Sequence, residues 1–398
     1  MLYSRVNCGF RSVVEILKIF NDALGGVLGQ IPSRNTIEDW VKKCGLDVYN
    51  TPKKSQKPQD YALIVDDSMM MGSEKLLLTL GIPAKHEGSP LTLKDVSILD
   101  MSVSPSWNGE GIKDRLLATS AKIGYSPQYV ISDNASIMTK GVNLTSLPHH
   151  HDISHSLGMY LERCYKNEED FISYTKSMSE VQFKYNMKNI AYLLPPRQRT
   201  IARFINLSNW VEWSQKMLNV YHKLKPQERA IYAFVPANAS LIDELSEVMT
   251  CINSLEKECK QHGFSRNTID KCMKTIQNLL FNGNYRMKKL GEAICTYLQN
   301  EGKMLKDQKS KHNISSDIIE SVFGIYKRRK SSNKLLGVTS FILFIPAQIQ
   351  FLQSKSGKDY WAKQHLENIR LSQIQQWEKA YLTTNLVTKR INTLKSAG

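Results

Sequence analysis

The sequence predicts an α/β protein whose mixed-sheet core is interrupted by an all-α insertion and preceded by a small helical domain. Strand-like apolar runs alternate with helical patterns between residues 60 and 165. From about residue 160 to 310 strand patterns vanish, and Lys, Glu, Asn and Leu recur at helical spacing. Strand-to-helix layering is expected to resume only at residues 313–334, so the helical stretch interrupts the core.

The composition favours a polyanionic partner. The 398 residues are enough for two or three domains, and a hydrophobic share of 41% with 23% charged residues is typical of a soluble globular protein. Lys and Arg number 53 against 37 Asp and Glu, which gives a net charge of +16. This excess of positive charge favours nucleic acid as the binding partner, and an anionic membrane surface as the second choice. The alternative is a soluble protein that is basic without binding a polyanion.

Cysteine usage and hydropathy indicate a cytoplasmic protein without a membrane partner. The seven cysteines are scattered and form no CxxC pair, which predicts reduced thiols and no disulfide or zinc framework. No signal sequence opens the chain. The apolar stretch 335–352 contains Pro346 and two glutamines, so it predicts a buried strand or helix in place of a membrane span.

The first 52 residues predict a helix-turn-helix DNA-binding domain. A crowded apolar helix over 10–24 is broken by three glycines, and Pro32-Ser33 is a start signal for a second helix that Gly45 is expected to end. Arg34, Lys42 and Lys43 of this second helix would contact DNA. A small helical packing domain is the alternative. Residues 51–59 have the composition of a linker.

The order of the next elements is that of a ribonuclease H-like layer. Residues 61–68, 75–80 and 96–103 predict three successive strands, and a helix over 109–124 precedes a strand that ends at Asp133. A further strand-to-helix unit follows. The predicted divisions are a first core part over 60–165, the all-helical insertion over 166–310, a second core part over 311–355 and a helical tail over 356–398.

A ribonuclease H-like sheet carries carboxylates at set places, which here hold Asp66, Asp133 and Glu320. Three clustered carboxylates repel one another unless cations lie between them, and hard oxygen ligands select Mg²⁺ or Mn²⁺. Two such ions can activate a water or 3′-hydroxyl and stabilise the leaving oxygen of a phosphodiester. Consecutive strand residues point to opposite faces, so only one of Asp66 and Asp67 can join the cluster.

The chain resembles a DDE-type transposase of a bacterial insertion sequence, with features similar to hAT transposases. The resemblance is carried by "IVDDSMMMGSEKLLLTLGI", "SWNGEGI", "YVISDNASIMTKG", "HDISHSL" and "SSDIIESVFGIYK" in that order. Its register makes Asp66 the metal ligand and Asp67 a variable neighbour. The resemblance also implies that Asp152 and His155, in a D-x-x-H arrangement, steady the metal site or handle a phosphate; a polar cluster at a strand end is the alternative.

Several further residues are candidates for DNA contacts. Lys327 lies seven residues after Glu320, a spacing similar to that of one transposase group, but the Arg and Tyr expected upstream are replaced by Ser316 and Asn313. The basic residues that follow the helix would form a phosphate-binding track, with a solvated helix end as the alternative. This track comprises Lys327, Arg328, Arg329, Lys330 and Lys334.

A tryptophan pair and a histidine-rich run each allow both a functional and a structural interpretation. In related enzymes a tryptophan of the insertion stacks on a flipped base, a role open to Trp210 or Trp213, although both fit a helix core. The "HHHDISH" run suggests zinc, but consecutive histidines converge poorly on one ion and no cysteine lies at ligand spacing.

The resemblance implies a transposase that cleaves and joins element ends with two Mg²⁺ ions, or Mn²⁺ in their place. Its partners would be double-stranded DNA of the terminal repeats and target, and a second copy of the chain in a homodimer or larger synaptic complex. Its location would be the bacterial cytoplasm, on the nucleoid. A metal-dependent nuclease of the same fold and a DNA-binding protein derived from a transposase without catalysis are the alternatives.

Overall fold

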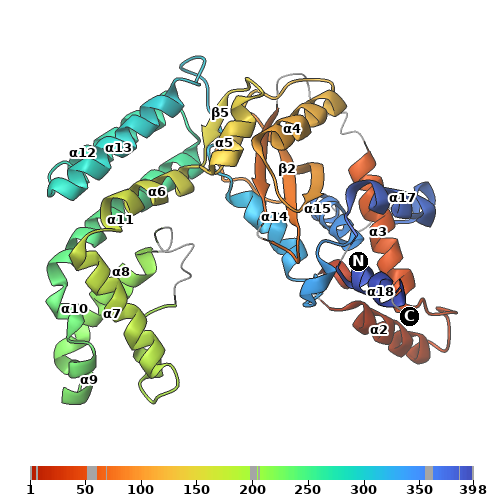
Figure 1. Ribbon diagram of the computed structural model, residues 1–398, viewed down its shortest axis with the longest axis horizontal. Helices are drawn as coiled ribbons and strands as arrows, with labels where there is room; N and C mark the ends of the chain where they lie inside the picture. Colours follow the sequence, from red (N-terminus) through yellow and green to blue (C-terminus); the bar gives the residue numbers. More distant parts are fainter. Residues whose placement is uncertain are drawn as a thin grey trace. The chain divides into compact units, whose positions relative to one another are not determined.

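The computed structural model describes residues 2–5, 8–51, 61–68, 70–197, 204, 207–354, 362–384 and 386–396. The chain divides into two compact units (Figure 1). The sheet unit comprises Met1–Ala84, Leu91–His149 and Ser316–Gly398, and the helical unit comprises Lys85–Pro90 and His150–Ser315. Apart from Thr51, the predicted linker 51–59 lies outside the described residues.

A mixed five-stranded sheet forms the centre of the α/β core, as the sequence predicts. The strand order is β3-β2-β1-β4-β5, in which β1 pairs antiparallel with β2, β2 pairs antiparallel with β3, and β1 pairs parallel with β4. The strands are β1 (Tyr61–Asp67), β2 (Lys75–Pro83), β3 (Ser97–Ser104), β4 (Val130–Ser132) and β5 (His149–His151).

Helices cover both faces of this sheet, which explains why β1 reads as a continuous apolar run. Ala62 and Ile64 pack on the face that α3, α14 and α15 cover, whereas Leu63 and Val65 pack on the opposite face, against α4 and α5. The α-helices of the sheet unit are α1 (Leu2–Arg5), α2 (Phe10–Ala23), α3 (Arg34–Asn50), α4 (Gly109–Ile123), α5 (Ser136–Asn143), α14 (Asp317–Lys327), α15 (Phe344–Gln353), α16 (Ala362–Asn368), α17 (Leu371–Tyr381) and α18 (Leu386–Ser396). Two 3₁₀ turns, η4 (Lys334–Leu336) and η5 (Ser340–Leu343), precede α15.

The N-terminal helices belong to the same compact unit as the sheet. The predicted start of α3 is confirmed, because the Ser33 side chain caps it by accepting from the Thr36 N–H at 3.1 Å. The predicted end at Gly45 is wrong, since α3 continues to Asn50. Gly45 lies where α3 crosses η5, and a Cβ there would meet the Leu343 carbonyl oxygen at 1.8 Å. The glycine therefore serves close packing between two backbones.

The stretch 335–352 forms η4, η5 and most of the buried helix α15, which confirms the predicted buried segment. No helix in the described part of the chain is both long and apolar enough to cross a membrane. A strand followed by a helix is predicted for residues 313–334. The helix is present as α14, but the described residues of that stretch form no strand.

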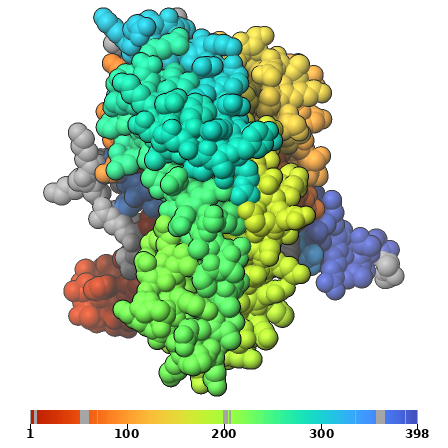
Figure 2. Space-filling view, turned by 90° about the vertical axis from the view of Figure 1, so that its left-hand side faces the viewer, coloured from red at the N-terminus to blue at the C-terminus, as the bar shows by residue number. Residues whose placement is uncertain are grey.

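The described elements of the helical unit between residues 166 and 310 are all helices, as expected. The unit begins earlier than the predicted insertion because Ile153, Leu157 and Leu161 of α6 are part of its core. Figure 2 shows the surface that these helices form, coloured from yellow-green to cyan. The α-helices are α6 (Ile153–Tyr165), α7 (Glu169–Tyr185), α8 (Leu207–Val220), α9 (Pro226–Ile231), α10 (Phe234–Ala237), α11 (Ala239–His262), α12 (Arg266–Leu279) and α13 (Tyr285–Gly302), with 3₁₀ turns η1 (Ala191–Leu193) and η3 (Tyr221–Lys223).

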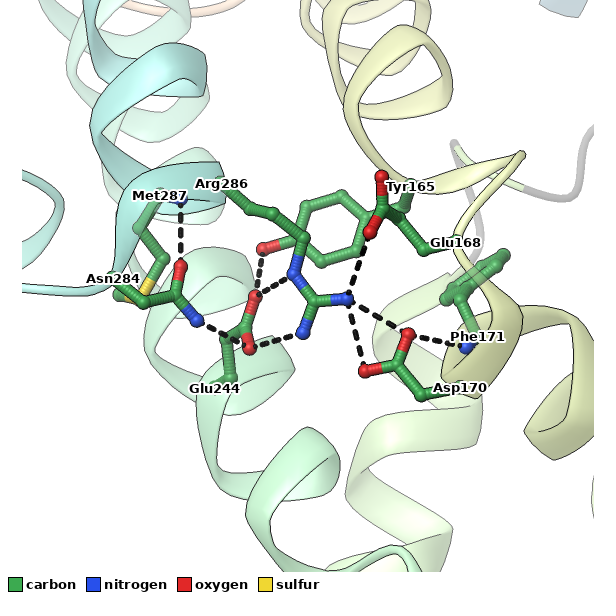
Figure 3. A network of polar contacts seen from close by, with 8 residues as sticks. All are labelled: Tyr165, Glu168, Asp170, Phe171, Glu244, Asn284, Arg286 and Met287. Atoms are coloured by element: carbon green, nitrogen blue, oxygen red, sulfur yellow. Dashed lines mark hydrogen bonds and ion pairs between the residues drawn. The ribbon is translucent and has the colours of Figure 1, made fainter.

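An arginine at the start of α13 ties four helical segments together (Figure 3). The Arg286 guanidinium donates to Asp170 at 2.8 Å and to Glu244 at 2.7 Å, and it lies 3.6 Å from Glu168. Its central carbon lies 5.4 Å from the centroid of the Tyr165 ring, whose hydroxyl donates to Glu244 at 2.7 Å. Hydrogen bonding to Arg286 lowers the pKa of Asp170. The network therefore joins α6, α7 and α11 to α13.

None of the seven cysteines takes part in a disulfide. The sulfur atoms of Cys259 in α11 and Cys272 in α12 lie 3.9 Å apart in the core. The hydrogen bond with the Cys272 thiol, reinforced by burial, raises the pKa of Cys259 well above its usual value. These thiols are core residues of the helical unit.

Candidate active site

The register of β1 on β4 aligns two of the predicted acids. Leu63 pairs with Val130 and Ile64 with Ile131 in parallel strands. Continuing this register places Asp66 opposite Asp133, which directly follows β4. Because neighbouring parallel strands end at the same edge of a sheet, the two carboxylates belong to one edge. Both residues are half-buried.

Strand alternation separates Asp66 from Asp67. Ala62 and Ile64 face α14 and α15, so Asp66 belongs to that face and Asp67 to the opposite one. The contacts of Asp67 agree, because its carboxylate accepts from the Lys75 ammonium of β2 at 2.8 Å. Asp67 thus has a structural ion pair, and Asp66 is the member of the pair on the side of α14.

Backbone N–H groups orient the two strand-end carboxylates. Oδ1 of Asp66 accepts from the N–H of Asp67 at 2.7 Å, and Oδ1 of Asp133 accepts from the N–H of Ala135 at 3.0 Å. The second bond is an Asx turn that leads into α5. The Ser132 hydroxyl, one residue earlier, lies 2.8 Å from Nε2 of His149 and thereby ties the end of β4 to β5. Carboxylate oxygens held in this way are the donor type that Mg²⁺ and Mn²⁺ prefer.

Glu320 lies on the exposed side of α14. The opposite side of this helix buries Ile318, Ile319, Val322 and Phe323 against the sheet face to which Asp66 belongs. The helix begins after Ser316, as predicted, and places Asp317 and Glu320 in its first turn. In the described part of the chain, no three His, Cys, Asp or Glu side chains are grouped to hold a metal ion. The convergence of Glu320 with the strand acids stays a prediction.

The basic run after α14 contains residues of different kinds. Lys327 and Arg328 are exposed, whereas Arg329 is half-buried. The Arg329 guanidinium lies 4.2 Å from the centroid of the Tyr3 ring and 5.0 Å from that of Phe344, which indicates cation–π contacts with both rings. Lys330 is half-buried, and its N–H donates to the Tyr326 carbonyl at 2.9 Å. Arg329 therefore also packs against α1 and α15.

The predicted DNA contacts of α3 include a small ion-pair cluster. Arg34 and Lys42 flank the Glu38 carboxylate at 3.6 Å and 2.9 Å. The Arg34 side chain remains 51% exposed, whereas that of Lys42 is 16% exposed. Lys43 is half-buried. The most accessible cation of this set is thus Arg34, at the first position of the helix.

The two tryptophans of α8 pack as core residues. Trp210 is 4% exposed and its indole N–H donates to the Pro196 carbonyl at 2.7 Å. Trp213 is half-buried, donates to the Leu193 carbonyl at 3.2 Å and contacts the Tyr232 ring edge-on. These contacts match the packing alternative. Base stacking by Trp210 would require this side chain to leave the core.

Histidines of the helical unit form a buried hydrogen-bonded cluster. Nδ1 of His150 lies 2.7 Å from Glu301, Nε2 of His150 lies 2.9 Å from Nδ1 of His312, and Nδ1 of His151 lies 3.1 Å from Glu301. Burial, reinforced by the neighbouring His150, lowers the pKa of His312 to about 4. Burial opposes ionisation of Glu301, but its hydrogen bonds to His150 and His151 leave its pKa below the usual value. The cluster joins β5 to α13 as a polar core.

Asp152 and His155 form a helix cap. The buried carboxylate of Asp152 accepts from the backbone N–H of His155 at 2.8 Å and lies 2.9 Å from its Nδ1, at the start of α6. Both residues belong to the helical unit, whereas Asp66, Asp133 and Glu320 belong to the sheet unit. The capping contact explains the D-x-x-H spacing locally.

Sequence reasoning missed Lys75 and Glu74 of the β1–β2 hairpin. The hairpin register pairs Asp67 with Leu77, and Lys75, two residues earlier in β2, shares the face of Leu77, so this diagonal position is the signal that could have indicated the ion pair. The Glu74 side chain is buried, its Oε2 accepts from the Val338 N–H at 2.8 Å, and burial raises its pKa. No local pattern indicates this second contact, because its partner lies far along the chain.

Searches with the sequence find no matching protein-family model and no matching curated protein.

Proposed function

We propose that this chain is a DNA transposase of the DDE type, built on a ribonuclease H-like core. The observation that carries the proposal is the parallel register of β1 and β4, which sets Asp66 opposite Asp133 at one sheet edge. The strand order β3-β2-β1-β4-β5, with three antiparallel strands followed by a parallel one, supports the fold. The net charge of +16 supports a DNA substrate.

In this proposal Asp66 and Asp133 hold divalent metal from adjacent strand ends, and Glu320 completes the set from α14. When bound, two Mg²⁺ ions, or Mn²⁺, supply activation of the attacking oxygen and stabilisation of the leaving oxygen. The backbone N–H groups of Asp67 and Ala135 fix one oxygen of each strand acid. The carboxylates are thereby oriented before metal arrives, which limits the ordering cost of binding.

Separate groups are proposed to bind the DNA backbone. Arg34 at the start of α3 and the exposed Lys327 and Arg328 after α14 would contact phosphates. A second copy of the chain would hold the other element end in a synaptic complex.

The test compares variants of the two proposed metal ligands, Asp66 and Asp133, with a variant of the neighbouring Asp67. Asp66→Asn and Asp133→Asn should lower metal-dependent cleavage of DNA that flanks the coding sequence by roughly 10²–10³-fold, as loss of a charge-stabilising group does. Asp67→Asn is the matched control, because it removes the same charge from the opposite face and should keep cleavage within a few-fold. Mn²⁺ binding, followed by electron paramagnetic resonance, should weaken in the first two variants and persist in the control.

The products distinguish the reaction classes. Joined 3′ ends in target DNA support the transposase, whereas cleavage without joining would indicate a nuclease of the same fold. An Asp133→Asn protein that cleaves and joins like the parent would overturn the proposed site. DNA binding without metal-dependent cleavage by the parent protein would indicate a chain that has lost catalysis.

A further inference from the structure

A cation-lined pocket lies between the N-terminal helices and the segment that follows α14. Its volume is about 620 Å³, and its walls include Arg11 of α2, Arg34 and Lys42 of α3, and Arg329. All of these residues belong to the sheet unit. The pocket contains one acidic side chain, Glu38, among its described lining residues. Four cations against one carboxylate leave a net positive pocket.

Two of these arginines occupy positions that disfavour a cation. Arg34 and Arg11 lie in the first turns of α3 and α2, and neither first turn contains an acidic residue. The N-terminal end of a helix carries partial positive charge, so a cation there is unfavourable. An anion in the pocket would reverse the sign of this interaction.

The pocket also offers preorganised phosphate-binding groups. The guanidinium of Arg329 is held against the Tyr3 ring at 4.2 Å, so it loses little freedom on binding a ligand. Thr339 and Ser340 also line the wall. Arginine forks match the oxygen atoms of a phosphoryl group through paired hydrogen bonds.

We propose that this pocket binds a phosphoryl group through Arg11, Arg34 and Arg329, with Lys42 beside them. The pocket shares Arg34 with the proposed DNA contacts but contains none of the strand-end acids, so a failure of the proposed cleavage chemistry would leave phosphoryl binding here intact. The phosphoryl group belongs to a DNA backbone or to a small phosphate-bearing molecule, since both present the same oxygen atoms.

Two binding assays in EDTA separate these sources without any metal-dependent chemistry. The first follows the anisotropy of a labelled 30-base-pair duplex at several salt concentrations, and the second measures binding of pyrophosphate by calorimetry. Arg11→Glu should lower the affinity for the ligand roughly tenfold. In the duplex assay it should also reduce, by about 1–2, the slope of the logarithm of the binding constant against the logarithm of the salt concentration. Lys18→Glu is the matched control, because it makes the same charge change on α2 outside the pocket lining.

Each outcome decides the matter. If Arg11→Glu weakens duplex binding and pyrophosphate displaces the duplex, the ligand is backbone phosphate. Loss of pyrophosphate binding with unchanged duplex binding identifies a small phosphate. Equal effects of Arg11→Glu and Lys18→Glu in both assays would overturn the proposal. Arg34→Gln provides a second, milder variant, and thermal melting checks that each variant folds.

Discussion

Asp66 and Asp67 are adjacent residues of the same type that the strand assigns to opposite faces. Asp66 shares its face with Ile64 and α14, and Asp67 forms an ion pair with Lys75. The side chains of that pair are 15% and 29% exposed, so its contribution to stability is modest. Activity and stability should therefore respond differently to substitution at the two positions.

Asp67→Asn should lower the free energy of unfolding by about 0.5–1 kcal/mol, because it removes the charge that faces Lys75. Chemical denaturation followed by circular dichroism measures this change. Lys75→Met should cost a similar amount, and the double variant should cost less than the sum of the two. Additive costs would show that the ion pair contributes nothing to stability.

At the scale of elements, the crossing of α3 with η5 depends on Gly45. A Cβ at this position would meet the Leu343 carbonyl oxygen at 1.8 Å, and neither backbone can yield without disturbing the buried helix α15. Gly45→Ala should destabilise the sheet unit by about 2–3 kcal/mol through this overlap. Thermal melting of the variant measures the loss.

Gly324 provides a control for the Gly45 prediction within the same unit. It lies inside α14, and a Cβ there would meet nothing within 4 Å. Gly324→Ala should therefore stabilise the helix by about 0.5–1 kcal/mol, because alanine restricts the unfolded chain more than glycine does. Equal destabilisation by both alanine variants would contradict the packing role of Gly45.

The elements could be predicted from the sequence wherever local patterns determine them. The strands β1 and β2 are apolar runs separated by a turn, and α3 begins at a Ser33 cap, so their positions follow from nearby residues. The alignment of Asp66 with Asp133 also follows once a ribonuclease H-like order is assumed. Gly45 was misread as a helix end because the backbone that requires a glycine lies about 300 residues away in the chain.

Long-range polar contacts could not be predicted for the same reason. Asp100 of β3 is buried, accepts from Nε of Arg115 at 3.0 Å and lies 3.3 Å from the Tyr49 hydroxyl of α3. Arg286 likewise meets carboxylates from two other helices. Each partner alone has the pattern of a surface charge, and only the tertiary structure shows which charges are compensated.

Arg286 connects the elements of the helical unit, and its removal should weaken that unit selectively. Arg286→Met keeps much of the packing on Tyr165 but leaves Glu244 and Asp170 without their cation. We expect a loss of about 2–4 kcal/mol, since the Glu244 carboxylate, whose side chain is only 9% exposed, remains uncompensated. Lys271→Met, which removes an exposed partner of Glu258, is the control and should cost less than 1 kcal/mol.

At the scale of the whole molecule, two compact units with separate hydrophobic cores are expected to unfold in separable steps. Arg286→Met should shift only the step that belongs to the helical unit, and Gly45→Ala only the step of the sheet unit. Calorimetric scans of both variants measure these shifts. A single transition that moves equally in both variants would show that the two units unfold together.

The stability of the helical unit should also depend on pH through its buried histidine cluster. Burial lowers the pKa of His312 to about 4, below the value near 6.5 of an unfolded histidine. Between these values the unfolded chain binds a proton that the folded chain resists, so stability falls as the pH falls through this window. Protonation of Glu301 acts in the same direction, because its pKa is lowered: as the pH falls from the usual glutamate value toward this lowered pKa, the unfolded chain again binds the proton more readily.

His312→Asn isolates this effect, because its amide can replace the contact of Nδ1 with His150 but does not titrate. The parent should lose stability on the order of 3 kcal/mol more than this variant between pH 6.5 and 4, as the size of the pKa shift implies. Urea unfolding of the helical unit at half-unit pH steps measures both slopes. Equal slopes in the two proteins would mean that His312 takes up its proton equally well in the folded and unfolded chain, which its burial at 7% exposure should prevent.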